Sequence, residues 1–398
     1  MHVSPLMEGS FDADVLVVGL GAMGSMALWR LARRGARVIG FDRFEPPHAL
    51  GSSHGESRII RTAYYEGPGY VPLVREAFDL WRELEAESGA TILTMTGALM
   101  IGSPSSEVVA GALASAKEHG LEHEILDGTQ VGRRFARHRL LDHEVAVHEA
   151  AAGFVRPEVG IGAALGRARA LGARVLNGHA VERVAPIGGG RAGDGVEVRV
   201  AGRTWRGRHA VVCAGAWNSA GLVDGLEVKL EVTRQCMVWF RPRTPALHTP
   251  ERAPVFVHDI GGSRALFGYG FPSVDGETVK VGVVARTAPQ DPEAIDRAIH
   301  PADLEAAADY VRGALPDLDP TPVRAVVCLQ ENSPDRHFVI GAVAPDVTVL
   351  AGFSGHGFKF APVIGDIAAD LALQGTTSRS IAPFSPQRFA HKLHGSHA

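Results

Sequence analysis

Cysteine is scarce in this chain of 398 residues, which has three: Cys213, Cys236 and Cys328. An odd, sparse set without CxxC spacing argues against a disulfide framework and fits a reducing compartment. No apolar run reaches the roughly 18 residues that a membrane span needs. The first dozen residues are polar and lack the basic start and apolar centre of a secretory signal. We therefore expect a cytoplasmic protein with no membrane partner and no metal pattern built on cysteine.

An excess of charge is also lacking, because the formal net charge is −4 and 21% of residues are charged. The basic residues at 133–139 are typical of a solvated helix face, so no nucleic acid is expected as a partner. Hydrophobic residues make up 45% of the chain, which is enough for a sizeable core and for two domains.

The N-terminal region carries a dinucleotide-binding pattern. An apolar strand at 14–18 runs into GLGAMG at 19–24, then a helix at 25–34 and a second strand at 37–41 that ends at Asp42. Strand, GxGxxG turn, helix, strand and terminal acid in this order are much more specific than the glycines alone. Gly19, Gly21 and Gly24 allow close approach of a pyrophosphate at the helix N-terminus, and Asp42 can bond a ribose hydroxyl.

The rest of the chain alternates between two patterns. A long polar loop at 46–61 follows the second strand, and helices are expected at 71–88, 107–119, 158–171, 291–315 and 361–373. A hairpin is expected through the glycines at 188–190, and an apolar strand at 210–213 meets a second glycine turn. Alternating apolar residues between 228 and 284 predict a mostly antiparallel sheet.

The C-terminal region contains the stretch AGFSGHGFKF at 351–360, directly after an apolar run at 347–350. A buried strand that ends in a glycine-rich turn is typical of a backbone approaching a ligand. About thirty residues upstream, Cys328 ends another apolar run.

Together these segments resemble the monomeric sarcosine oxidase and N-methyltryptophan oxidase family of FAD-dependent amine oxidases, over nearly the whole chain. The resemblance implies a mixed α/β fold, with a Rossmann-type FAD-binding domain and an inserted antiparallel-sheet substrate domain. We expect the FAD-binding domain at 12–90, 154–226 and 323–390, and the substrate domain at 91–153 and 227–322.

In that family the cysteine matching Cys328 holds FAD covalently. A nearby cation would favour the reactive thiolate, and Arg58, His54 and Lys359 are the candidates. The loop GSSHGESR at 51–58 is similar to the family's flavin-contacting loop. The FAD contacts expected here are Gly19, Gly21, Gly24, Asp42, Ser53, His54, Ser57, Arg58, Val181, Cys328, Gly355, Gly357 and Lys359.

The resemblance also implies three catalytic residues. Arg61 and Lys359 match the pair that binds the substrate carboxylate, and a buried carboxylate needs such cationic partners. Lys280 matches the lysine that speeds oxygen reduction at the flavin, where a cation stabilises developing negative charge.

Two departures from the family pattern concern the substrate pocket, for which we expect Arg61, Gly268, Tyr269, Val284 and Lys359. Val284 stands where the family has a histidine, and Gly268 stands at one of two adjacent tyrosine positions. These changes predict a larger and less polar pocket, and a substrate bulkier than sarcosine.

The sequence thus predicts an oxidase of an N-substituted or cyclic amino acid that uses dioxygen and yields an imine and hydrogen peroxide, working as a monomer. One alternative is a dehydrogenase with another electron acceptor. Another is a biosynthetic flavoprotein that desaturates a tailored or carrier-bound amino acid.

Overall fold

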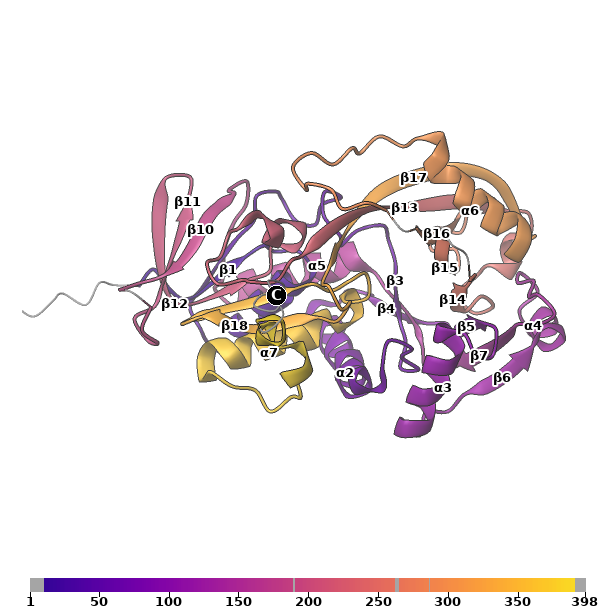
Figure 1. Cartoon of the computed structure of the whole chain (residues 1–398), viewed down its shortest axis with the longest axis horizontal. Helices are drawn as coiled ribbons and strands as arrows, with labels where there is room; N and C mark the ends of the chain where they lie inside the picture. The colour runs from indigo at the N-terminus through magenta and orange to yellow at the C-terminus, as the bar shows by residue number, and fades with distance from the viewer. Residues whose placement is uncertain (1–10, 189, 262–264, 286, 391–398) are drawn as a thin grey trace, which may run out of the picture.

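The computed structural model describes residues 11–188, 190–261, 265–285 and 287–390 (Figure 1). Residue 189 of the expected glycine hairpin and residues 1–10 of the polar N-terminal segment lie outside these ranges. Two eight-stranded sheets stand at opposite ends of an elongated molecule. Strands β10, β11 and β12 mark one end in Figure 1, and β5, β6 and β7 mark the other.

The first sheet has a parallel centre in which β1 pairs with both β2 and β12, while β9 and β19 extend it. Strands β10, β11 and β18 add antiparallel pairs at its edges. The central strands are almost wholly buried, as their near-continuous apolar runs require. The strands are β1 (Ala13–Val18), β2 (Val38–Phe41), β9 (Arg174–Leu176), β10 (Val181–Pro186), β11 (Val196–Val200), β12 (Arg203–Val212), β18 (Val339–Ala344) and β19 (Val347–Ala351).

Four helices share one apolar core with this sheet. Helix α1 follows the GxGxxG turn and is buried over almost its whole length. It is tied to α7 by ion pairs from Arg30 to Asp366 (2.6 Å) and from Arg34 to Asp370 (2.7 Å). The helices are α1 (Ala22–Arg33), α2 (Val71–Ser88), α5 (Pro157–Ala170) and α7 (Ala361–Gln374).

The second sheet has the order β17-β13-β16-β15-β14-β5-β7-β6 and is antiparallel except for the β5–β14 pair. Helix α6 (Pro301–Ala314) packs on one face of it, whereas the other face turns toward the first sheet's side of the molecule. The strands are β5 (Ala98–Gly102), β6 (Glu124–Asp127), β7 (Val145–Glu149), β13 (Glu231–Pro242), β14 (Val255–Asp259), β15 (Ala265–Gly270), β16 (Val279–Ala285) and β17 (Leu318–Asn332).

A small sheet of β3 (Arg58–Ile60), β8 (Gly153–Val155) and β4 (Leu93–Met95) lies between the two large ones. Helices α3 (Glu107–His119) and α4 (Gly128–Arg134) complete the outer part of the second sheet. The expected mixed α/β fold, with a Rossmann-type part and an inserted antiparallel sheet, is confirmed. The expected domain limits stay a prediction; one of them falls inside β17, which runs from the second sheet toward the first.

The expectation of a helix over 291–315 is wrong for its first half, because α6 begins at Pro301 and residues 287–300 form neither helix nor strand. Pro301 disfavours a helical residue before it and suits the first helical position. Side-chain bonds hold the preceding segment instead: Arg234 donates to its backbone at Asp296 O (2.7 Å), and its own Arg297 side chain donates to Leu50 O (2.6 Å).

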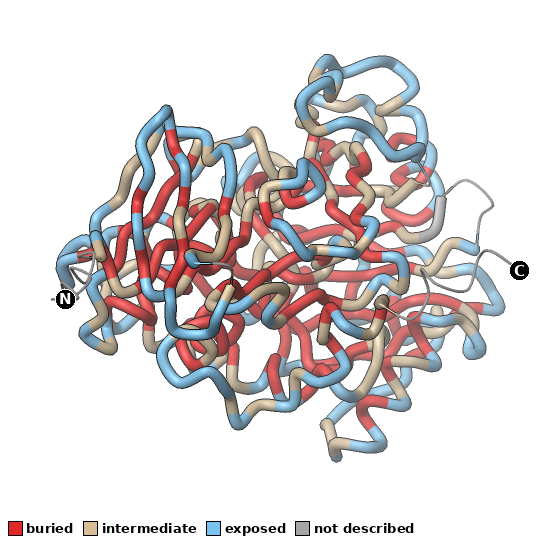
Figure 2. The backbone as a smooth tube through the Cα atoms, turned by 60° about the vertical axis from the view of Figure 1, so that its left-hand side comes forward, coloured by how far each residue is buried: buried red, intermediate tan, exposed pale blue. Residues whose placement is uncertain are grey.

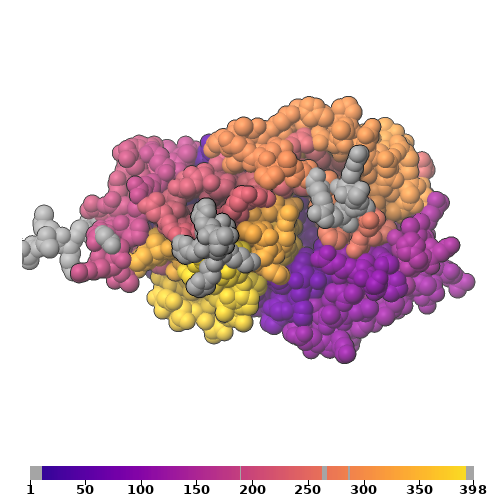
Figure 3. Space-filling model, viewed as in Figure 1, coloured from indigo at the N-terminus to yellow at the C-terminus, as the bar shows by residue number. Residues whose placement is uncertain are grey.

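Burial follows the layers, since the strands and the helices of the first core are buried while residues 287–300 are largely exposed (Figure 2). Segments far apart in sequence meet on one face of the molecule, where chain from the middle and from the C-terminus lies against chain from the first third (Figure 3). Within the described ranges, no helix has both the length and the apolar character needed to cross a bilayer.

Candidate functional site

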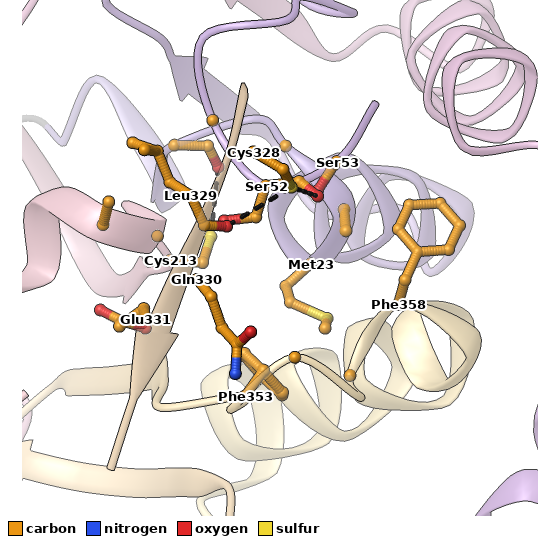
Figure 4. A pocket seen from close by; sticks show the side chains of 18 of the residues that line it. Met23, Ser52, Ser53, Cys213, Cys328, Leu329, Gln330, Glu331, Phe353 and Phe358 are labelled. Atoms are coloured by element: carbon orange, nitrogen blue, oxygen red, sulfur yellow. Dashed lines mark hydrogen bonds between the residues drawn. The ribbon is translucent and has the colours of Figure 1, made fainter. Parts of the chain in front are cut away.

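A cavity of about 470 Å³ lies where the two large sheets face each other. Its walls come from the carboxyl ends of β1, β2 and β12, from the loops after them, from β13, β15, β16 and β17, and from the turn after β19. Figure 4 shows β17 crossing this cavity, with Cys328 and Gln330 on it and Met23 of α1 opposite. The carboxyl ends of parallel strands are where such folds bind ligands.

The three glycines of the GxGxxG turn have different roles. Gly19 has φ +84°, and a Cβ on Gly24 would lie 1.7 Å from Gly19 O, so both glycines serve the close packing of the turn. Gly21 lines the cavity, and a Cβ there would meet only Ser53 Oγ, at 3.9 Å. The space in front of Gly21, at the N-terminus of α1, is therefore free for a dinucleotide pyrophosphate, and the residues present fit that group.

The end of β2 supplies the acid of the dinucleotide pattern. Asp42 is buried, lines the cavity and accepts hydrogen bonds from Leu20 N (2.7 Å) and Phe44 N (2.8 Å). Each carboxylate oxygen has lone pairs left for a ribose hydroxyl. Val181 lines the same end, as does the second glycine turn at Ala214 and Gly215.

The polar loop at 51–58 is held from two sides. Glu158 accepts from Gly55 N (2.6 Å), and Lys280 Nζ donates to Gly55 O and Ser57 O, at 2.6 Å each. Lys280 is buried against the Phe271 ring, 4.1 Å from its centroid, and burial with nearby Arg58 lowers its pKa well below the ordinary value. Lys280 therefore supports the loop from behind and is not among the cavity-lining residues.

Within this loop, His54 and Ser57 are buried and do not line the cavity, while Ser53 and Arg58 do. Burial, and next the charge of Arg58, lower the pKa of His54 to about 4, so this histidine is neutral near pH 7. His54 therefore does not supply the cation that we expect beside Cys328.

Cys328 lies on β17 with its side chain half-buried at the cavity wall. Arg58 is the cation beside it, with one guanidinium nitrogen 3.7 Å from Sγ. Burial raises the pKa of the thiol, and Arg58 and Lys280 partly offset that rise. Of the three expected cations, Arg58 is thus the one that contacts the Cys328 thiol, since Lys359 bonds to other groups.

Arg61 and Lys359 both line the cavity, and both cations lie near the Tyr64 ring, 4.5 and 5.1 Å from its centroid. The Arg61 guanidinium pairs with Glu66 (2.6 Å), donates to Ala63 O (3.0 Å) and stacks on the rings of Tyr64 and Tyr65, 4.5 and 4.3 Å from their centroids. Although burial opposes it, the Arg61 charge, with His356 and Lys359, holds the pKa of Glu66 below its usual value. The ion pair of Arg61 and Glu66 is therefore charged even though it is buried.

Lys359 sits in a one-turn 3-10 helix, Phe358–Phe360, at the start of α7. Its Nζ donates to His356 O (2.8 Å), while its backbone oxygen accepts from Trp81 of α2 (2.9 Å). Burial, and then the neighbouring Arg61, lower the pKa of Lys359 from 10.5 to about 7. Its charge is therefore set by pH in the neutral range.

The expected role of Gly268 in the substrate pocket is wrong. Residues of β15 alternate between the two faces of the sheet, so Phe267 and Tyr269 line the cavity, and Gly268 does not. A Cβ on Gly268 would meet the Tyr310 ring of α6 at 2.5 Å, on the face away from the cavity. Val284 on β16 does line the cavity, and the Tyr269 ring lies over Gly282.

The expected site residues thus divide into two groups. A first group lines the cavity: Gly19, Gly21, Asp42, Ser53, Arg58, Arg61, Val181, Tyr269, Val284, Cys328, Gly355, Gly357 and Lys359. A second group does not, and consists of Gly24, His54, Ser57, Gly268 and Lys280. Gly24, His54, Ser57 and Lys280 still contact the turn or loop that does.

Sequence reasoning missed several cavity residues. Glu66 gives a weak signal, as an acid five residues after Arg61 in a polar loop. Phe267 and Phe271 share the two-residue period of Tyr269, so the strand pattern itself points to them. Gln330 shares the strand face of Cys328 for the same reason. Trp217 and Glu293 reach the cavity from distant segments, and no local pattern marks them.

Known proteins resemble the chain over almost its full length. The family model for FAD dependent oxidoreductases (DAO) matches residues 14–371. A monomeric sarcosine oxidase from Streptomyces avermitilis is 43% identical over 384 residues, covering 95% of this chain and 98% of the relative. An N-methyl-L-tryptophan oxidase from Salmonella enteritidis is 32% identical, covering 95% and 99%.

Among solved structures, NikD is described as an unusual amino acid oxidase essential for nikkomycin biosynthesis. It superposes with a TM-score of 0.83 at 26% identity and covers 95% of this chain and 98% of its own. The resemblance drawn from the motifs is confirmed.

Proposed function

The chain belongs to the family of FAD dependent oxidoreductases, and from this we propose that it oxidises an N-substituted or cyclic amino acid to an imine, with dioxygen reduced to hydrogen peroxide. The observation that carries the proposal is the buried pair Arg61 and Lys359 in the wall of a cavity that also contains the dinucleotide turn. FAD supplies a two-electron acceptor for the C–H bond next to the amine.

The chain's own residues support a carboxylate-bearing substrate, for which Arg61 and Lys359 form the proposed carboxylate clamp. Arg61 stays charged, Lys359 can carry a second charge, and both are shielded from water. A low-dielectric site of this kind favours a ligand that brings a negative charge and hydrogen-bond acceptors. Relatives named as sarcosine and N-methyl-L-tryptophan oxidases act on N-methyl amino acids, which have such a carboxylate.

The rest of the wall supports a bulky substrate. Aromatic and aliphatic side chains from five strands, and from the residue that follows β15, line the same cavity, namely Ile59, Met237, Val257, Phe267, Tyr269, Phe271 and Val284. A small substrate would leave this surface in contact with water, whereas a ring or long side chain would bury it at about 25 cal/mol per Å².

The cofactor would be held by Gly21 and α1 at its pyrophosphate and by Asp42 at its ribose. We propose that Cys328 forms the covalent attachment to FAD, supported by the guanidinium of Arg58 beside the thiol. We also propose that dioxygen is the acceptor, that Lys280 aids its reduction, and that the enzyme is a monomer of the cytoplasm.

A second candidate function is a dehydrogenase or desaturase of a tailored amino acid in a biosynthetic pathway. The likeness to NikD, an oxidase described as essential for nikkomycin biosynthesis, supports the biosynthetic substrate of this alternative and not its electron acceptor. It shares the cavity and the clamp with the first candidate but differs in electron acceptor and in the size of the substrate.

The test is an oxygen-electrode screen of the purified yellow holoenzyme with sarcosine, N-methyl aromatic amino acids, proline, pipecolate and simple secondary amines. We expect steady oxygen uptake and peroxide formation with a bulky N-substituted or cyclic amino acid. Reduction of the flavin by substrate without oxygen uptake would favour the alternative. No flavin reduction by any of these compounds would contradict the proposal.

A further inference from the structure

Gln330 stands on the same face of β17 as Cys328, two residues further along the strand. Two residues of strand span about 7 Å, so its amide enters the cavity close to the expected point of flavin attachment. The side chain is half-buried and lines the cavity, and Figure 4 shows its amide between Phe353 and Met23.

The orientation of this amide follows from the hydrogen bonds of Asn332. The Asn332 Nδ2 group donates to Thr233 Oγ1 (3.1 Å), Gln330 O (3.2 Å) and Glu231 O (3.3 Å). Its Oδ1 also accepts from Arg336, which has no acceptor of its own. Asn332 Oδ1 is therefore the acceptor for Gln330, whose Nε2 donates to it at 2.8 Å.

This arrangement leaves the Gln330 carbonyl oxygen, Oε1, without a hydrogen-bond donor among the described residues, on a side chain that lines the cavity. The amide packs on the turn that carries Lys359: a Cβ on Gly355, where φ is +83°, would lie 2.7 Å from Gln330 Nε2. The Gln330 amide thus packs closely on the turn that leads to Lys359.

A second glutamine of the cavity wall provides the contrast. Gln235 pairs with Cys328 across the β13–β17 ladder, but both ends of its amide are used by Ala285. Nε2 donates to Ala285 O (3.1 Å), and Oε1 accepts from Ala285 N (3.3 Å). Gln235 is therefore a strand-to-strand link, whereas Gln330 Oε1 has no donor within the part of the chain that the structure describes.

We infer that Gln330 is a specificity-determining residue whose side-chain carbonyl accepts the N–H of the substrate amine. This inference rests on the proposed function. Arg61 and Lys359 take the carboxylate, and Gln330 selects amines that keep an N–H as the free base, which tertiary amines lack. An N–H or O–H donor on either the substrate or the cofactor could bond to the Gln330 carbonyl. The test must therefore distinguish these two sources of the donor.

The test compares N-methyl-L-phenylalanine, which has an N–H as the free base, with N,N-dimethyl-L-phenylalanine, which has none. The third probe, 3-phenylpropanoate, has a carboxylate and no nitrogen and is measured as a competitive inhibitor. In Gln330→Leu we expect kcat/KM for the N-methyl compound to fall about tenfold, the effect of one lost hydrogen bond in a closed site. The kcat/KM for the N,N-dimethyl compound and the inhibition constant of 3-phenylpropanoate should stay within about twofold of their values in the native enzyme.

Gln235→Leu is the matched control and should leave the ratio between the two amines unchanged. Gln330→Glu keeps an acceptor and should preserve the preference for an N–H, which also provides a test if Gln330→Leu does not fold. The visible spectrum and flavin content of the resting enzyme should be the same in all folded variants.

Equal losses on all three probes would overturn the inference, as would an unchanged ratio between the amines in Gln330→Leu. A changed resting spectrum or lost flavin with an unchanged ratio would assign the acceptor to the cofactor and also overturn it. Failure of the proposed function has a separate signature, because 3-phenylpropanoate would then bind equally well to the native enzyme and to Arg61→Ala.

Discussion

Arg61 and Lys359 face the same cavity but differ in how firmly they hold a positive charge. Glu66 pairs with Arg61 and raises the pKa of the guanidinium despite the opposing effect of burial. Lys359 has no carboxylate at salt-bridge distance among the described residues, and its pKa falls to about 7. The clamp therefore joins a permanent charge to one that responds to pH.

The first prediction concerns both cations of the clamp. Arg61→Ala and Lys359→Ala should each weaken carboxylate-bearing substrates by about 1.5–3 kcal/mol, roughly tenfold to a hundredfold. Simple secondary amines without a carboxylate should lose much less. The measurement is kcat/KM on matched pairs of compounds. Similar losses on both classes would show that the cations do not bind a carboxylate.

The second prediction is the pH dependence of ligand binding. The Lys359 ammonium is charged below its pKa of about 7 and neutral above it. A bound carboxylate favours the charged form, so affinity should be highest below pH 7 and fall as pH rises further, by up to tenfold per unit. Titration of the holoenzyme with 3-phenylpropanoate from pH 6 to 9 measures it. In Lys359→Met the affinity should be lower and much flatter with pH; an unchanged slope would assign the titration to another group.

Lys280 carries the third prediction. The expected role is acceleration of the reaction between reduced enzyme and dioxygen, but its Nζ is bound to Gly55 O and Ser57 O behind the loop. Lys280→Met should slow reoxidation by orders of magnitude in stopped flow while affecting anaerobic reduction much less. Equal slowing of both half-reactions would instead indicate that Lys280 only holds the loop, and an unchanged reoxidation rate would remove the role altogether.

At the scale of elements, strands β15 and β16 decide which residues can shape the pocket. The period of two places Tyr269 and Val284 toward the cavity and Gly268 toward α6. Gly268 thus gives room to the Tyr310 ring, and of the two exchanged positions only Val284 lines the cavity.

The fourth prediction separates these two positions. Val284→His should add a polar group to the cavity and shift kcat/KM from bulky amino acids toward sarcosine. Gly268→Tyr should leave that ratio unchanged and lower stability by about 1–3 kcal/mol, because the side chain would collide with Tyr310. Substrate profiles and thermal melts of the two variants measure both effects. A changed substrate ratio in a well-folded Gly268→Tyr would contradict this division of roles.

At the scale of the whole molecule, the cavity exists only because two sheets face each other. β17 pairs with β13 in the second sheet, and its far end meets the turn after β19 through the Asn332–Phe353 bridge. Cys328 and Gln330 lie within the paired stretch, just before this bridge. The dinucleotide turn, the thiol and the substrate wall thus share one cavity although they come from separate segments.

The fifth prediction follows from the place of Cys328 on this strand. Flavin should stay with the protein after acid precipitation, and Cys328→Ala should release it on denaturation. The alanine variant should also show a melting temperature that depends on added FAD, because its ligand binds reversibly. The flavin content of the supernatant and of the pellet is the measurement. Free flavin from the native enzyme would show that no covalent bond forms.

Local patterns in the sequence were sufficient for several features. The strand, glycine turn, helix and terminal acid of residues 14–42 specify their own conformation, because every signal lies within one βαβ unit. The antiparallel pattern between 228 and 284 and the glycine turn after 350 are local for the same reason. Family likeness then indicated Arg61, Cys328 and Lys359, all of which line the cavity.

Only the tertiary structure decided which groups meet across the cavity and which face each strand residue presents. The Arg58–Cys328 contact joins residues 270 positions apart, and no local pattern encodes that distance. The orientation of Gly268 depends on the register of β15 against its neighbours, and a shift of one residue would reverse it. The depressed pKa of Lys359 likewise comes from burial, which depends on chain packed around it from α2 and from the Tyr64 loop. The sequence by itself thus determined the cofactor class and the local elements, whereas packing between distant segments decided the charges and shape of the site.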